Sequence, residues 1–85
     1  MKITDLEKLV YTGDPIAVAE RPYRIVNNTM YIPGIDSDGE YADDLRIAVV
    51  DGAMTLFHKK PGETIWVYGG RYTDYQDMVS VIYIL

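Results

Sequence analysis

The side chains of this protein that are best suited to chemistry are concentrated in one acidic segment, residues 36–44. The segment holds five carboxylates and no basic residue: Asp36, Asp38, Glu40, Asp43 and Asp44. Closely spaced carboxylates can coordinate a hard cation such as Ca²⁺, can work as a general acid and base, or can present negative charge to a partner. The surrounding residues distinguish these three chemistries.

The spacing of the carboxylates does not match an EF-hand calcium loop. Such a loop has a glycine at its sixth position and a bidentate glutamate at its twelfth. Counted from Asp36, the glycine is Gly39 at the fourth position, and the twelfth residue is Ile47. We therefore predict no metal ion, with a site of another type built from the aspartates of the segment as the alternative.

Acid–base and nucleophilic catalysis find little support in the sequence. Asp43 and Asp44 are adjacent, so in a strand they point to opposite faces, and the segment has little apolar cover to bury either one. The only histidine, His58, has no carboxylate near it in the sequence, and the chain contains no cysteine and no phosphate-binding glycine loop. We predict no catalytic residue, no cofactor, and a protein that is not an enzyme.

The acidic segment accounts for the net charge of −5 of the whole chain. Residues 1–35 hold four acidic and four basic residues, and residues 45–85 again hold four of each. A polyphosphate or an anionic membrane needs cations along the contact, and the bases here are scattered through the sequence. We predict no direct binding to nucleic acid or membrane, and instead a partner protein with a basic surface.

Tyrosine is the second unusual feature, with eight tyrosines against one tryptophan and one phenylalanine. Tyrosine offers a large rigid surface with a polar tip and is enriched at protein interfaces. Most of the tyrosines fit half-buried strand positions. Tyr41 lies inside the acidic segment, and Tyr72 and Tyr75 lie in a polar stretch, so we predict that these three contact the partner together with the five carboxylates.

The elements on either side must position the acidic segment, and the first of them is a helix. Thr4 and Glu7 form a capping box, in which each side chain satisfies a free backbone N–H of the first turn. Gly13 and Pro15 follow and favour the end of a helix. A short helix is expected over residues 5–12.

Short apolar runs separated by turn residues then predict strands. They cover residues 16–20, 23–26, 29–32, 46–50, 53–59 and 64–68. The pairs Asn27-Asn28, Asp51-Gly52 and Pro61-Gly62 favour tight turns between successive strands, and Gly69-Gly70 is expected to end the last one. We predict a single domain over residues 1–85, α+β and mostly β: a small antiparallel sheet, or partly open barrel, of about six strands with one short N-terminal helix.

The C-terminal residues 74–85 allow two interpretations. Thr73 and Gln76 form a second capping box that favours a helical turn. Val79 to Leu85 are rich in β-branched and aromatic residues and favour a last strand, with a helix as the competing prediction. An apolar strand at the chain end needs a partner at its edge, so residues 79–85 are where we expect any homo-oligomer contact.

Taken together, these patterns predict a small acidic protein-binding module, cytoplasmic because the chain lacks cysteines and an export signal. The carboxylate-rich segment would dock on the basic, nucleic-acid-binding surface of a target protein and inhibit it. In size, acidity, absent cysteine and α+β layout, the chain is similar in kind to small phage-encoded inhibitors such as the uracil-DNA glycosylase inhibitors and anti-CRISPR proteins, without a shared motif. The alternative is an assembly subunit that associates through its C-terminal strand, with the acidic segment serving only solubility.

Overall fold

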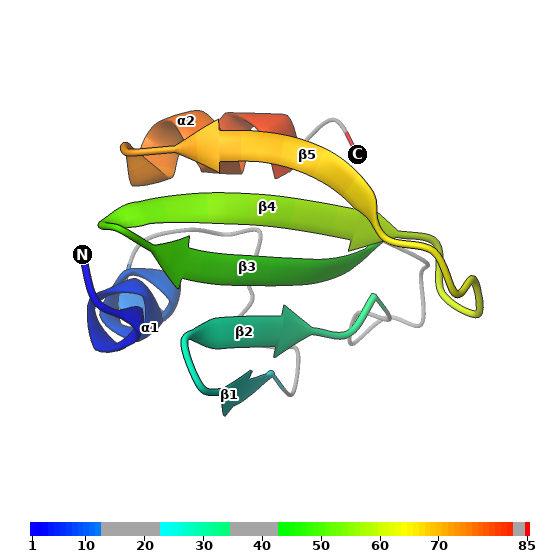
Figure 1. Ribbon diagram of the computed structural model, residues 1–85, viewed down its shortest axis with the longest axis horizontal. Helices are drawn as coiled ribbons and strands as arrows, with labels where there is room; N and C mark the ends of the chain where they lie inside the picture. The colour runs from blue at the N-terminus through cyan, green and yellow to red at the C-terminus, as the bar shows by residue number, and fades with distance from the viewer. Residues whose placement is uncertain (13–22, 35–42, 83–84) are drawn as a thin grey trace.

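In the residues that the structure describes, five strands form one antiparallel sheet and two helices lie against it (Figure 1). The computed structural model describes residues 1–12, 23–34, 43–82 and 85. In chain order the elements are α1 (Ile3–Thr12), β1 (Arg24–Val26), β2 (Thr29–Ile32), β3 (Asp44–Val50), β4 (Ala53–Lys59), β5 (Val67–Tyr72) and α2 (Tyr75–Ile82). The strands lie side by side in the order β1-β2-β3-β4-β5, which makes the sheet a simple meander.

Two of the predicted hairpins are confirmed, and their turn residues explain why. Strands β1 and β2 are joined by Asn27-Asn28, and β3 and β4 by Asp51-Gly52. The backbone φ is +55° at Asn27, +51° at Asp51 and +78° at Gly52. Asparagine, aspartate and glycine tolerate this left-handed conformation better than other residues, and a two-residue turn between twisted strands requires it.

The two faces of the sheet differ because side chains alternate along each strand. In β3, Leu45, Ile47 and Val49 are buried, whereas Arg46 between them is only half-buried. Helices α1 and α2 pack on the buried face; β5 passes in front of α2 in Figure 1, so the viewer looks at the opposite side of the sheet. We call this opposite side the open face.

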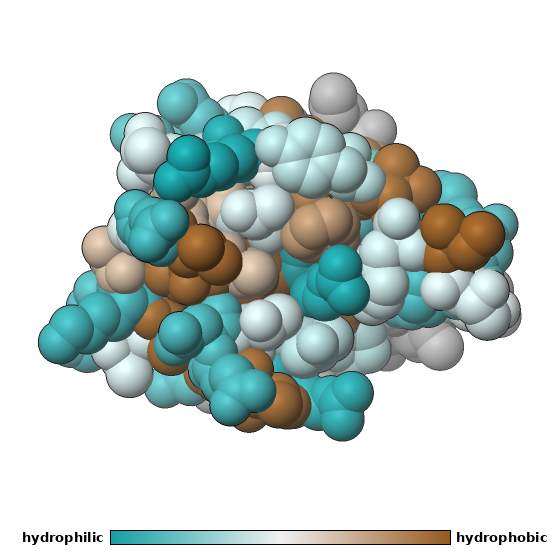
Figure 2. Space-filling view, in the orientation of Figure 1, coloured by the Kyte–Doolittle hydropathy of each residue, from teal (hydrophilic) through white to brown (hydrophobic). Residues whose placement is uncertain are grey.

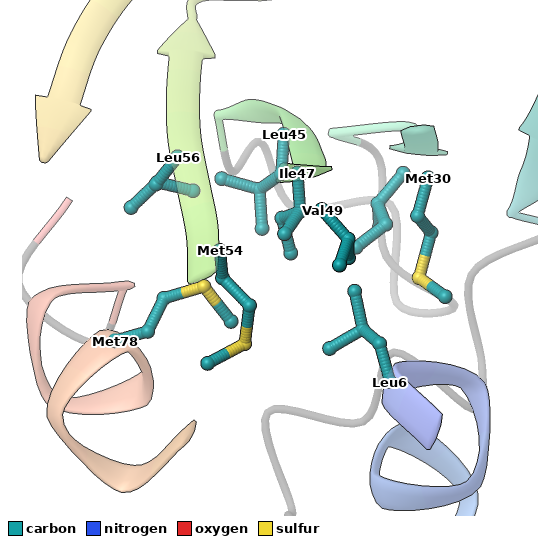
Figure 3. Close-up of a cluster of buried hydrophobic side chains, with 9 residues drawn as sticks. Leu6, Met30, Leu45, Ile47, Val49, Met54, Leu56 and Met78 are labelled. Carbon is teal, nitrogen blue, oxygen red and sulfur yellow. The ribbon is translucent and has the colours of Figure 1, made fainter. Parts of the chain in front are cut away.

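The hydrophobic core lies between the sheet and the two helices. Its nine buried side chains are Leu6, Met30, Ile32, Leu45, Ile47, Val49, Met54, Leu56 and Met78. Leu6 from α1 and Met78 from α2 approach the strand side chains from different sides (Figure 3). Three of the nine are methionines, whose unbranched thioethers fit irregular gaps between elements.

The predicted α+β class, mostly β and antiparallel, is confirmed, with differences in the strand count and in the helices. The described sheet has five strands rather than about six, and it is open, since β1 and β5 are not paired with each other. The predicted strand 16–20 lies outside the described residues. Helix α1 begins at Ile3 rather than at residue 5, and the Asp5 carboxylate accepts a hydrogen bond of 2.9 Å from the backbone N–H of Lys2.

The last strand also differs from the prediction, because Gly69 and Gly70 lie inside β5 and do not end it. The pairing of β4 with β5 is irregular between Leu56 and Phe57, opposite these glycines. A Cβ atom on Gly69 would lie 3.0 Å from Cγ of Leu56, and Gly70 has a φ of +112°. Only glycine fits both demands, so here the glycine pair marks a bulge within a strand.

Residues 75–82 form helix α2, so over residues 79–82 the predicted strand is wrong and the competing helix is right, while residues 83 and 84 lie outside the described residues. The Asp74 carboxylate caps α2 by accepting hydrogen bonds from the backbone N–H groups of Gln76, at 2.8 Å, and Asp77, at 3.3 Å. Met78 and Val79 are buried on the inner side of this helix. Their burial outweighs the β propensity of the local sequence. Residues 79–82 therefore offer no strand for edge-to-edge pairing, and no helix among the described residues is long and apolar enough to cross a membrane.

If α2 is an integral part of the core, shortening Met78 will destabilise the fold. We expect Met78→Ala to lower the free energy of unfolding by about 2–5 kcal/mol, because it leaves a cavity between α2 and β4. The control is Ser80→Ala, two residues further along the same helix and exposed, which should change it by less than about 0.5 kcal/mol. Urea denaturation of both variants measures this; equal stability of the two would contradict the observed packing of α2.

Candidate functional site

Asp44, at the end of the acidic segment, is held by two neighbours. It lies opposite Lys59 in the β3–β4 pairing, and its Oδ2 is 2.7 Å from Nζ of that lysine. Its Oδ1 accepts a hydrogen bond of 2.7 Å from the backbone N–H of Gly34. The backbone of Gly34, just after β2, is thereby bonded to the side chain of Asp44, at the start of β3.

Asp43 points to the other side of the sheet and is only 6% exposed. Its Oδ2 accepts a hydrogen bond of 2.9 Å from Nδ1 of His58, and its Oδ1 lies 2.8 Å from Nζ of Lys60. Burial by itself raises the pKa of Asp43, but the hydrogen bonds and positive charge of Lys60 and His58 more than offset it, so the pKa lies below the ordinary value of 3.8. The same contact with Asp43 raises the pKa of Lys60.

These ion pairs change the interpretation of the acidic segment. The sequence predicted five carboxylates turned outward, whereas Asp43 and Asp44 are turned toward bases at the end of β4. Asp36, Asp38, Glu40 and Tyr41 lie outside the described residues. His58, for which the sequence showed no nearby carboxylate, has one in space. The register of the Asp51-Gly52 hairpin, extended to its open end, would have placed both aspartates beside Lys59 and Lys60.

An imidazole oriented by an aspartate supplies two of the three members of a hydrolytic triad, and the third is a nucleophile such as a serine hydroxyl. Among the described residues, however, the only hydrogen bond of the His58 side chain is the one to Asp43, and no hydroxyl lies within hydrogen-bond reach of it. The described residues also contain no group of three or more side chains that could hold a metal ion. The observed effect of the Asp43–His58 contact is to fix the end of the acidic segment to the sheet.

Of the three tyrosines predicted to bind a partner, two pack against the core, and Tyr41 lies outside the described residues. Tyr72 and Tyr75 are half-buried and pack against the hydrophobic core. The Tyr72 hydroxyl also donates a hydrogen bond of 2.6 Å to the backbone carbonyl of Gly69, which braces the bulge in β5. Both side chains thus have packing contacts on the helix side of the sheet, and neither lies on the open face.

A row of cationic and aromatic side chains crosses the open face from one edge of the sheet to the other. Strand pairing brings them into register as Arg24, Tyr31, Arg46, Phe57 and Tyr68, one from each strand. The guanidinium of Arg24 lies 5.1 Å from the centre of the Tyr31 ring, and that of Arg46 lies 4.3 Å from the centre of the Phe57 ring. Phe57 meets Tyr68 edge-to-face, with ring centres 5.9 Å apart. We call these five side chains the cross-strand row.

Trp66 adds a second ring beside this row. The guanidinium of Arg46 lies 4.9 Å from the centre of the Trp66 ring, and Nζ of Lys59 lies 5.2 Å from it. Arg46 therefore contacts two aromatic rings at once, an arrangement in which the negative faces of the rings attract the cation. Trp66 also lines a surface hollow of about 270 Å³, together with Arg24, Tyr31, Pro33 and Asp44 among others.

Apolar residues are exposed where β5 begins: Ile65 is 75% exposed, Val67 50% and Tyr68 62%. Tyr68 belongs to the row, whereas Val67 is paired with His58 and so lies on the other face of the sheet. Figure 2 shows the open face, with hydrophilic side chains interleaved with intermediate and hydrophobic ones across the sheet. Sequence reasoning missed this surface, although the two tight hairpins alone predict that Arg24 lies opposite Tyr31 and Arg46 opposite Phe57. No protein-family model, curated protein or solved structure matches this chain.

The low pKa of Asp43 predicts a specific acid sensitivity. A pKa below that of the unfolded chain, 3.8, stabilises the fold fully above that value, and this contribution is lost as the pH falls through the lower pKa of the folded state. We expect Asp43→Asn to lower the free energy of unfolding at neutral pH by about 1–3 kcal/mol, with the deficit shrinking below pH 3.8.

Urea denaturation of the wild type and the variant from neutral pH to about pH 2 measures this difference. Asp51→Asn serves as the control, because asparagine keeps the positive φ of that exposed turn residue. A deficit for Asp43→Asn that stays constant over the whole pH range would show that the charge of Asp43 does not stabilise the fold.

Proposed function

We propose that this domain is a protein-binding module, and not an enzyme, and that the open face of its sheet is the contact surface. The observation that carries the proposal is the set of Arg46, Trp66 and Tyr68 on this face. Arginine, tryptophan and tyrosine are the residues that most often dominate the binding energy of protein interfaces. The ring of Tyr68, which is 62% exposed, supplies apolar area that a partner can bury.

The contacts within the cross-strand row support this proposal because they fix the side chains before a partner arrives. Arg46 is held between Phe57 and Trp66, and Phe57 is held in turn by Tyr68. Ordering a long side chain at an interface opposes binding by about 0.5–1.5 kcal/mol, which a side chain already held in place largely avoids.

The dimensions of the molecule set an upper bound on the area that the open face can offer. The molecule measures 33 × 28 Å along its two longer axes, and in Figure 1 the sheet lies in the plane of these axes. An interface of ordinary size needs about 800 Å² from each partner.

Shortening the anchors of the open face should weaken partner binding strongly and leave the fold intact. We expect Tyr68→Ala and Trp66→Ala each to weaken binding about tenfold or more, as is typical of interface anchors. Gln76→Ala, exposed on α2 on the far side of the sheet, is the matched control. The tagged domain is used to capture partners from a lysate of its own organism, and calorimetry then gives the affinities.

The result that supports the proposal is a protein captured by the wild type and by Gln76→Ala and lost with both open-face variants. Equal capture by all four proteins would show that the open face is not the contact surface. Circular dichroism of each variant establishes that it is folded.

The acidic segment supplies a second candidate contact, supported by a separate observation. Asp44 bonds to Gly34 and Lys59, so both ends of the segment are fixed to the sheet. A loop with fixed ends presents its side chains in a limited region of space. In this second proposal Asp36, Asp38 and Glu40 occupy the basic, nucleic-acid-binding surface of a target protein and inhibit it by standing where phosphates would bind.

A triple variant, Asp36→Asn, Asp38→Asn and Glu40→Gln, tests the acidic segment without disturbing the ion pairs of Asp43 and Asp44. If the segment is the contact, the variant should bind at least about tenfold more weakly, and the salt dependence of binding should fall, with unchanged urea denaturation. The control neutralises three exposed acids elsewhere: Asp51→Asn, Glu63→Gln and Asp77→Asn. If the two triple variants weaken binding equally, the acidic segment acts only through the net charge of the protein and is not a specific contact.

A further inference from the structure

We infer that the open face receives an acidic segment of a partner protein that also carries a large apolar side chain. This inference rests on the proposed function and names the chemistry of its partner. It begins from a contrast of charge: the protein as a whole carries −5, yet the open face gathers cations. They are Arg24, Arg46, Lys59 and Arg71.

Most of these cations are available to a partner. Lys59 is paired with Asp44 at 2.7 Å. Among the described residues, Arg24, Arg46 and Arg71 have no carboxylate within ion-pair distance. Three guanidinium groups on one face of an acidic protein make that face complementary to carboxylates and repulsive to other basic surfaces.

Arg46 is the best placed of the three to receive a carboxylate. Its guanidinium lies over Phe57 at 4.3 Å and by Trp66 at 4.9 Å. The planar fork of N–H donors on a guanidinium matches the two oxygens of a carboxylate. Since Arg46 is half-buried, the ion pair would form with less screening by water than one on an exposed arginine.

The apolar requirement comes from Tyr68, at one end of the row, and from Ile65, which lies just before β5. Tyr68 is 62% exposed and Ile65 is 75% exposed. Their burial stabilises a complex only if the partner brings an apolar side chain to that position. A segment with alternating acidic and apolar side chains would satisfy the arginines and this patch together.

A single-stranded nucleic acid fits the same surface less well. Such ligands bind by stacking bases on exposed aromatic faces. Here cations already lie over the rings of Tyr31, Phe57 and Trp66. A nucleic acid also offers no aliphatic group larger than a methyl group to cover the exposed ring of Tyr68.

Fluorescence anisotropy with defined probes tests the inference directly on the full chain. The probes are four short labelled chains: a peptide alternating Glu with Leu, its Gln–Leu and Glu–Ser analogues, and oligothymidylate. We expect the Glu–Leu peptide to bind about tenfold or more tightly than the other three, because only it pairs the guanidinium groups and also covers the apolar patch.

Protein variants then locate the site. Arg46→Gln should weaken binding of the Glu–Leu peptide about tenfold, and Arg46→Lys should weaken it nearly as much, because a lysine lacks the planar fork. Lys2→Gln, which removes an exposed cation near the N-terminus, should have no effect. If thermal melting shows that either Arg46 variant is unfolded, Arg71→Gln, on an exposed residue of β5, replaces it with the same expectation.

Three results would overturn the inference. They are tighter binding of oligothymidylate than of the Glu–Leu peptide, equal binding of the Glu–Leu and Gln–Leu peptides, and concentration-dependent self-association that Arg46→Gln abolishes, which would make a second copy the occupant. None of these results decides the proposed function, which the capture experiment tests separately. Loss of a captured partner with Tyr68→Ala does not depend on the charge of that partner.

Discussion

The pairing of β3 with β4 is the constraint on which the rest of this structure depends. The Asp51-Gly52 turn fixes their register over all seven residues of each strand, from Val50 opposite Ala53 to Asp44 opposite Lys59. One face of this hairpin then carries Ile47 and Leu56 into the core, and the other places Arg46 beside Phe57. A slip by a single residue would exchange these two faces. The ion pairs at its open end also depend on this register, since Lys59 and Lys60 must lie beside the aspartates.

Much of this follows from the sequence, and the part that does not has identifiable causes. Two-residue turns specify the partners within each tight hairpin, so the pairs Arg24–Tyr31 and Arg46–Phe57 are predictable from residue types alone. The alignment of β2 with β3 crosses a long connection, and that of β4 with β5 crosses the bulge at Gly69 and Gly70. The register of these two strand pairs cannot be predicted from the residue types of the connections. The full cross-strand row is therefore visible only in the structure. The C-terminal helix was ambiguous because its β-branched residues favour a strand, and only the burial of Met78 and Val79 decides the matter.

Net charge proved a poor guide to the surface of this protein. The excess of acid lies in nine consecutive residues, and two of those nine are taken up by neighbouring bases. Half of the eight basic residues, scattered in the sequence, come together on the open face because alternate positions of adjacent strands share a side. A uniformly acidic protein would repel an acidic partner everywhere. Here the sheet separates the charges, so the same molecule can present surfaces of both signs.

The composition of the core has a consequence for how the molecule can be observed. Met30, Met54 and Met78 are fully buried, whereas Met1, the remaining methionine, is 40% exposed. Peroxide converts an accessible thioether into a polar sulfoxide, which a packed interior does not accommodate. Met1 should therefore oxidise at the rate of a free side chain, and the other three only when the domain opens. The rate at which the three buried methionines gain oxygen, compared with the rate for Met1, therefore reports how often the helices separate from the sheet.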